Sequence, residues 1–226
     1  MNLKQADARV GGLSNPSKMP CFGTSIPARA CRLGALLAQQ KGTTCSGCYA
    51  LKGMYGFPAV QAALEHRLAL VVEACASPEA HVEWVDAMAY LLNTRAAAQK
   101  RGRNDPAYFR WFDSGDLQSL QHLELIVDVA MLTPDVEHWL PTRELPTVIA
   151  WMASNGAFPP NLTVRLSANV VGAAPPKVEG CSGSGVHTIK GEPVAGAVEC
   201  EAYKNDNACG DCRKCWEVPS VSYLKH

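Results

Sequence analysis

The sequence has no excess of charge of either sign, because 21 Lys and Arg residues balance 21 Asp and Glu residues. Proteins that bind nucleic acid or anionic membranes through charge usually carry a basic excess. We therefore expect neither a nucleic acid nor a membrane as a partner. The one basic run, Lys100, Arg101 and Arg103, is predicted to be the solvated end of a helix, where cations complement the helix dipole.

The chain also lacks the apolar segments that direct a protein into or across a membrane. Its first residues, MNLKQADARVGG, contain no hydrophobic stretch of a signal peptide. No stretch approaches the roughly 20 apolar residues of a membrane span. We therefore expect the protein in the cytoplasm, where disulfides are rare. Its ten cysteines then need another explanation, and metal binding is the usual one.

Strand-like and helical patterns alternate along the chain. Strands are predicted at residues 20–26, 108–112, 136–140 and 162–166, and helices at 60–75, 78–92, 117–132 and 146–154. Such alternation predicts an α/β fold with a parallel sheet of βα units. The strand order is not readable, so a partial barrel and an open doubly wound sheet both fit. Residues 27–57 are predicted as a long loop, and 172–185 as a linker or covering segment.

The composition changes near residue 175. We predict an α/β domain over residues 1–175 and a cysteine-rich segment over 176–226 that packs on it. This segment is too short to build a core of its own, so a metal is expected to organise it.

Local signals define one helix more closely. Ser77 is a good N-cap for a helix that begins at Pro78. Its apolar face is predicted from residues at helical spacing, namely Val82, Val85, Ala89 and Leu92.

Four cysteines near the C-terminus give the sharpest functional signal. Cys209, Cys212 and Cys215 follow a C-x2-C-x2-C spacing, and Cys200 lies nine residues earlier. That spacing lets one loop reach three corners of an iron–sulfur cubane, whereas zinc sites usually have two well-separated cysteine pairs. We therefore predict that these cysteines bind an iron–sulfur cluster, of the [4Fe-4S] kind, and form no disulfides.

Cys31, Cys45 and Cys48 form a second group. A single CxxC pair can be a redox dithiol, but such a pair opens a helix directly after a strand, and here a long loop intervenes. Three thiolates on a four-iron cluster would leave one iron open. By analogy with catalytic zinc, an open position indicates chemistry and a closed one indicates structure. The chain is thus predicted to hold one or two clusters.

The remaining cysteines carry weaker signals. Cys75 fits the apolar face of its helix, and Cys21 lies in a predicted strand, so both are predicted core residues. Cys181 lies in CSGSG, which is not a phosphate-binding loop because no Gly-Lys-Ser/Thr follows. It is a spare ligand candidate.

A family resemblance rests on several of these motifs. NPSKMPCFG…CRLGALLAQQKGTTCSGCYA, the later SGDL and PTRE, and the terminal C…CGDCRKCW together resemble the bacteriophage gene-product-88 family, over most of the chain. The resemblance implies a phage origin, cluster binding and location in the host cytoplasm.

The cysteine loop ending in CYA is also similar to that of radical-SAM enzymes and their phage relatives. Those enzymes carry C-x3-C-x2-C, whereas thirteen residues separate Cys31 from Cys45, and no GGE-like segment follows for the amino group of SAM. We therefore do not expect SAM, although the similarity favours a partial barrel.

Polar residues follow several predicted strands. They are Asp113, Ser114 and Asp116, then Thr142, Arg143 and Glu144, then Ser167 and Asn169. Loops at the carboxyl ends of parallel strands gather on one rim, so we expect these residues near the Cys31–Cys48 loop. Asp116 is a candidate general base, Arg143 a candidate ligand for an anionic or carbonyl group, and Ser114 a weaker catalytic candidate.

Structural roles compete with these catalytic ones. Asp116 could instead cap a helix beginning at Leu117, and Arg143 could pair with Glu144. His122, His138 and His187 are predicted to be structural. No G-x-S-x-G elbow supports a serine hydrolase.

These signals together predict an iron–sulfur enzyme. An open iron would act as a Lewis acid on a small oxygen-containing substrate, in a hydrolase or hydro-lyase reaction such as ester hydrolysis. Radical-SAM-like or electron-transfer chemistry is one alternative. A zinc-binding interaction module without catalysis is another.

Overall fold

Seven parallel strands form one sheet in the part of the chain that the computed structural model describes, residues 1–99 and 107–225. The strands are β1 (Phe22–Thr24), β2 (Ala107–Trp111), β3 (Val136–Thr142), β4 (Leu162–Ser167), β5 (Ser182–His187), β6 (Val198–Glu199) and β7 (Ser220–Leu224). They lie in the order β1-β2-β3-β4-β5-β7-β6, and every neighbouring pair is parallel. The predicted parallel α/β fold is confirmed.

The strand order decides between the two predicted architectures. A doubly wound sheet reverses its order at a switch point, with helices on both faces. Here the first five strands follow one another in chain order, as in a partial barrel. The doubly wound alternative is therefore wrong.

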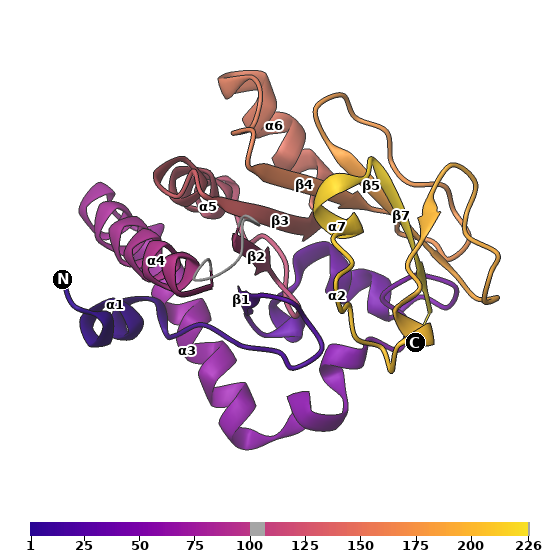
Figure 1. Ribbon diagram of the computed structural model, residues 1–226, viewed down its shortest axis with the longest axis horizontal. Helices are drawn as coiled ribbons and strands as arrows, with labels where there is room; N and C mark the ends of the chain where they lie inside the picture. Colours follow the sequence, from indigo (N-terminus) through magenta and orange to yellow (C-terminus); the bar gives the residue numbers. More distant parts are fainter. Residues whose placement is uncertain (100–106, 226) are drawn as a thin grey trace.

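Seven α-helices flank the sheet in the described residues. They are α1 (Leu3–Val10), α2 (Arg32–Ala38), α3 (Pro58–Ala74), α4 (Pro78–Gln99), α5 (Leu120–Leu132), α6 (Leu145–Asn155) and the short α7 (Lys214–Glu217). Four 3-10 helices are η1 (Ala28–Ala30), η2 (Tyr49–Leu51), η3 (Gly53–Gly56) and η4 (Ala202–Lys204). Figure 1 shows α4, α5 and α6 side by side on one side of the strands, with α7 and the C-terminal segment on the other. No helix in the described ranges is long and apolar enough to cross a membrane.

For the helix that begins at Pro78, the predicted cap is confirmed and the predicted apolar face is wrong in part. The Ser77 hydroxyl caps α4, accepting from the Ala80 amide at 3.2 Å, as predicted. Of the predicted apolar face, however, Val82 is 55% exposed. Three helices, α1, α3 and α5, pack on α4, so its buried face is broader than one stripe and includes Trp84 and Met88. The run Lys100, Arg101 and Arg103 lies outside the described residues.

The loop after β2 is also longer than predicted. The following helix, α5, begins at Leu120 and is capped by Ser119, whose hydroxyl accepts from the His122 amide. The alternative in which Asp116 caps a helix at Leu117 is therefore wrong. The predicted loop at 27–57 is wrong in part, because it contains α2 and three 3-10 helices.

The predicted linker at 172–185 contains a strand in the middle of the sheet. β5 pairs with β4 on one side and β7 on the other. Its glycines are required by close packing: a Cβ at Gly183 would lie 2.7 Å from Pro175, and one at Gly185 would lie 2.6 Å from Val194. The small residues of this segment resemble a linker in the sequence, but they are needed because neighbouring segments pack closely against the strand. β5, β6 and β7 all extend the sheet from within residues 176–226, and the predicted division at residue 175 stays a prediction.

The two faces of the sheet differ in what covers them. Successive strand residues point to opposite faces. Phe109 and Trp111 on β2 are fully buried in the large core with the helices. Tyr108 packs on the other face, where its ring lies 5.1 Å from that of Trp216 beside α7. Helices therefore cover one face of the sheet, and the cysteine-rich segment covers the other.

Candidate functional site

A cavity of about 600 Å³ contains most of the predicted site residues. Its lining includes Cys31, Cys45, Cys48, Cys200, Cys209 and Cys215, together with Ser114, Asp116, Arg143 and Ser167. Loops after β1, β2, β3 and β4 therefore meet at the carboxyl edge of the sheet. Cys212 is exposed and Asn169 is absent from the lining, so the structure brings together six of the seven predicted cysteine ligands around the cavity.

The first cysteine group is built around Gly34. A Cβ at this glycine would lie 3.6 Å from the Cys31 sulfur and 3.6 Å from the Cys45 sulfur. The two sulfurs therefore flank one space that the missing side chain leaves open. Cys48 follows in a tight turn, with its amide donating to the Cys45 carbonyl at 3.1 Å.

Two thiols of this group, Cys31 and Cys45, have raised pKa values. Burial, together with Asp116 and the other two thiols of the group, raises the pKa of Cys31 to about 12. Burial also raises the pKa of Cys45, against the lowering effect of Arg143. A metal that binds here must displace the thiol protons, as thiolate ligands require.

Residues at the ends of β3 and β4 hold the cysteine loop in place. The Glu144 carboxylate accepts from the Leu33 amide at 2.9 Å, and the Thr44 amide donates to the Asn169 carbonyl at 2.9 Å. Arg143 Nε donates to the Thr44 hydroxyl at 3.1 Å. Arg143 and Glu144 thus each contact the cysteine loop, in place of the mutual pair considered from sequence.

Asp116 joins the ends of two strands. Its buried carboxylate accepts from the Leu117 amide, the Thr142 hydroxyl and the Arg143 amide, at 2.8, 2.6 and 2.9 Å. Burial raises its pKa, although the hydrogen bonds oppose that rise. Asp116 therefore fixes the loop that carries Arg143, and its role as a base stays a prediction.

Ser114 is positioned by the adjoining strand. Its buried hydroxyl donates to the Ile26 carbonyl at 3.1 Å. That contact favours a positioning role, and its catalytic role also stays a prediction.

The second cysteine group lies on the face covered by the C-terminal segment. Cys215 packs with Cys21, Trp139 and Trp216 in a small buried cluster. Burial raises the pKa of both Cys21 and Cys215 to about 12, and Cys209 adds to the rise at Cys21. The backbone of Cys209 donates to the Lys18 carbonyl, which places the segment before β1 against the C-terminal cysteines.

Cys21 is therefore buried, as predicted from the sequence, and it packs beside a cysteine of the C-terminal group. Its position just before a strand gave no signal for this, because the neighbours come from the other end of the chain. Cys75 packs against the main core as predicted. Cys181 also packs there, with its sulfur 3.8 Å from that of Met152, and it does not line the cavity.

A buried arginine attaches the C-terminal segment to the sheet. Arg165 on β4 is fully buried and donates to the backbone carbonyls of Gly183, Cys215 and Val218, at 2.6, 3.1 and 2.7 Å. These bonds satisfy carbonyls around α7 and fix where Cys215 lies. The sequence RLS, within an apolar strand, gave only the hint that Arg165 faces away from the main core.

Arg110 is a second arginine whose position was not predicted from the sequence. Arg110 on β2 lines the cavity, with its guanidinium 4.7 Å from the centre of the Trp139 ring. Burial lowers its pKa, but the nearby Tyr49 and Asp113 outweigh this and leave the pKa raised. Arg110 is therefore a cation. Its alternation with Phe109 and Trp111 is the pattern that could have placed it opposite the core.

The donor set is of the soft kind that iron–sulfur clusters use, and cluster binding stays a prediction. Among the described residues, no three thiol, imidazole or carboxylate side chains lie close enough to hold one metal ion. Thiolates around a single zinc would lie about 3.8 Å apart, given Zn–S bonds of about 2.3 Å. Each thiolate of a cubane binds its own iron, so the sulfurs lie further apart. Ten free cysteines, six of them around one cavity, supply the soft thiolate ligands that such clusters use.

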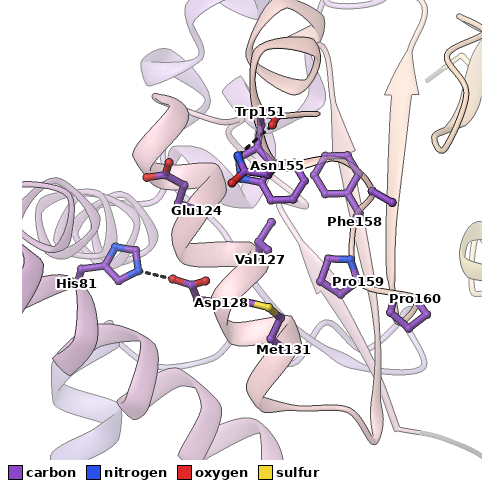
Figure 2. Close-up of a pocket in the computed structure, with 11 residues that line it drawn as sticks. His81, Glu124, Val127, Asp128, Met131, Trp151, Asn155, Phe158, Pro159 and Pro160 are labelled. Atoms are coloured by element: carbon purple, nitrogen blue, oxygen red, sulfur yellow. Dashed lines mark hydrogen bonds and ion pairs between the residues drawn. The ribbon is translucent and has the colours of Figure 1, made fainter. Parts of the chain in front are cut away.

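A second hollow of about 640 Å³ lies on the helical side and contains none of the predicted site residues. Figure 2 shows His81 and Asp128 pointing toward one another at one side of it, with Trp151 and Phe158 at another. The two rings stack with their centres 4.5 Å apart, and the His81–Asp128 pair is 2.6 Å long. We therefore centre the candidate site on the cysteine-lined cavity.

The fold and the cavity define an α/β protein with cysteine groups gathered at the carboxyl edge of a parallel sheet. A family model, Gene product 88, matches residues 1–218. The chain therefore belongs to the Gene product 88 family, as its cysteine motifs indicated. No curated protein and no solved structure matches the chain.

Proposed function

We propose that this protein is an iron–sulfur enzyme that acts on a small molecule in the cavity between its two cysteine groups. The observation that carries the proposal is that Cys31, Cys45 and Cys48 line the same cavity as Asp116 and Arg143. A structural metal site is closed by four protein ligands, whereas this group offers three thiols and faces an open space.

The bound cluster would supply an iron with an open coordination position, which acts as a Lewis acid on an oxygen-containing substrate. The chain itself supplies orientation and charge. Arg143 is held beside Cys45 by its bond to Thr44, so a polarised carbonyl or an anionic leaving group can lie against its guanidinium. Asp116 fixes the backbone of Arg143 and is a buried carboxyl group with a raised pKa. Such a group can accept a proton at the cavity wall.

Redox chemistry is the second candidate. The observation that favours it is that Cys200, Cys209 and Cys215 line the same cavity, so a cluster there would lie near the first group. Such a cluster, held by the C-terminal cysteines beside one held by the first group, would supply electron-transfer chemistry. The free thiols are consistent with a reducing compartment, which would be the host cytoplasm for a phage-encoded protein.

Metal analysis of anaerobically purified protein tests the cofactor. We expect a brown protein with broad absorption and roughly four irons per cluster. Cys45→Ala and Cys209→Ala should each lose iron, whereas Cys75→Ala should keep it, because Cys75 packs in the core. A colourless protein with stoichiometric zinc would instead support the interaction module and overturn the proposal.

An activity comparison separates the two kinds of chemistry. The oxidised protein, without reductant or SAM, should hydrolyse small activated esters. Cys45→Ala should abolish the reaction, and Arg143→Met should slow it by about tenfold or more, since orientation and charge are lost. Inactivity under these conditions, followed by SAM cleavage once dithionite and SAM are added, would favour the redox candidate.

A further inference from the structure

Arg110 is a cation in the cavity whose hydrogen-bonding capacity is only partly used, by a side-chain hydrogen bond to Tyr49. Its Nε is buried and has no hydrogen-bond partner within the described residues. Its Nη1 lies 3.7 Å from the Met19 sulfur, a weak acceptor. The Trp139 ring supports the plane of the guanidinium. The side chain is therefore fixed, charged and incompletely bonded.

The carboxylate nearest along the chain is already bonded elsewhere. The two oxygens of Asp113 accept from the Ser25 and Tyr55 hydroxyls, the latter at 2.6 Å. Tyr55 comes from η3 and Ser25 from the segment after β1, so contacts between different elements hold Asp113 in place. Because these donors occupy Asp113, the Arg110 N–H groups that do not bond Tyr49 stay available to a ligand.

The guanidinium suits one class of ligand. Its planar set of N–H donors matches the two oxygens of a carboxylate or a phosphate. We propose that Arg110 binds the anionic group of the substrate, a carboxylate or a phosphate, within the cavity. This proposal rests on the proposed function and adds a substrate class to it: small oxyanions.

Equilibrium dialysis of the holoprotein tests this directly, with inorganic phosphate and succinate as separate probes. Wild-type protein should bind one of them saturably, and the preferred probe identifies phosphate or carboxylate. Arg110→Met should weaken that binding at least tenfold. Arg110→Lys, which keeps the charge but loses the planar fork, should weaken it less. Arg9→Met is the matched control, because Arg9 pairs with Glu83 on the surface and should leave binding unchanged.

Labelling of the wild-type protein keeps the test independent of variant folding. Phenylglyoxal modification with peptide mapping should show that the bound anion slows labelling of Arg110 and not of Arg9. The proposal is wrong if neither probe binds, if Arg110→Met binds as well as wild type, or if the anion leaves Arg110 labelling unchanged.

The outcome can be separated from that of the proposed function. Anion binding is read at Arg110 without turnover, whereas the proposed function is read by iron content and ester hydrolysis. A protein that contains iron and hydrolyses esters but binds neither anion would contradict the Arg110 proposal alone. If Arg110 only balances the charge of the thiolates, Arg110→Met would change the reduction potential and leave anion binding intact, which also contradicts it.

Discussion

His138 lies between two partners that fix its tautomer. Its Nε2 is 2.8 Å from the Thr133 hydroxyl, which itself donates to the Val129 carbonyl, so the imidazole must donate at Nε2. Its Nδ1 then accepts from the Trp111 indole at 3.2 Å. Both ring nitrogens are satisfied only in the neutral form. Burial accordingly lowers the pKa of His138 to about 3.

This histidine predicts acid lability. The unfolded chain binds a proton at His138 below its ordinary pKa of 6.5, whereas the folded chain does so only near pH 3. The free energy of unfolding should therefore fall from about pH 6.5 downward, by up to about 1.4 kcal/mol per pH unit. His122, whose pKa burial also lowers to about 3, should add a similar slope.

Urea unfolding between pH 7.5 and 4.5 measures the slope. In His138→Gln, the free energy of unfolding should fall less steeply with decreasing pH, because one buried histidine no longer contributes to the fall. His66→Gln is the control for the loss of an imidazole, because His66 is exposed. A His138→Gln protein with the wild-type slope would contradict the assignment.

At the scale of elements, the loop after β2 is tightly constrained. Phe112 has a φ of 58°, and Gly115 has a φ of 90°. A Cβ at Gly115 would lie 2.3 Å from the Ile26 side chain and 2.8 Å from its carbonyl oxygen. The loop that positions Asp113, Ser114 and Asp116 thus depends on a glycine pressed against the end of β1.

Gly115→Ala should therefore be severely destabilising. The left-handed backbone costs an alanine about 1–2 kcal/mol, and overpacking adds about 1–3 kcal/mol. Gly156→Ala is the matched control, because Gly156 also has a positive φ but nothing within 4 Å of its Cβ position. Thermal unfolding of the two variants compares them. Equal losses would mean that the contact with Ile26 relaxes at little cost.

The C-terminal segment depends on Arg165 in a similar way. Arg165→Met removes donors from several buried carbonyls around α7, and each unpaired buried group costs about 1–3 kcal/mol. Thr163→Val removes a single bond, to the Trp216 carbonyl, and should cost about 1 kcal/mol. Hydrogen exchange should show faster opening of residues 200–218 in Arg165→Met than in Thr163→Val. Uniform acceleration across the sheet would contradict a local anchoring role.

At the scale of the whole molecule, the two sides of the sheet have different sources of stability. The helical side buries a large apolar core that includes Phe109, Trp111 and Ile126. The opposite side has a small cluster around Cys215 and a cavity lined by thiols. Metal should therefore matter for one side more than the other.

Removal of metal tests this asymmetry. Chelation under oxidising conditions should raise hydrogen exchange in residues 28–53 and 200–218, while β2, β3 and β4 stay protected by the apolar core. The Cys75→Ala protein, which keeps all the proposed cluster ligands, should respond as wild type does. Collapse of the whole sheet on chelation would show that metal stabilises the core as well.

Some of the helices and strands were predictable because their signals are local. The helix capped by Ser77, the stop at Gly156 and the strands around Phe109, Leu140 and Val164 all follow from spacing and neighbouring residues. β5 was not predictable, because its glycines look like a linker until Pro175 and Val194 are placed over them. The start of α5 was misplaced for a related reason: Asp116 is taken up by Thr142 and Arg143, which are distant in sequence.

The sequence by itself determined the α/β class, the grouping of cysteines by spacing and the family, because these depend on periodicity and on motifs within short segments. Only the tertiary structure decided that both cysteine groups face one cavity, that Cys21 joins the C-terminal cysteines, and that Arg110 lines the same cavity. The physical reason is that parallel pairing brings the carboxyl ends of distant strands to one edge. Which side chains meet there depends on register and on burial, and residues far apart in the chain set both.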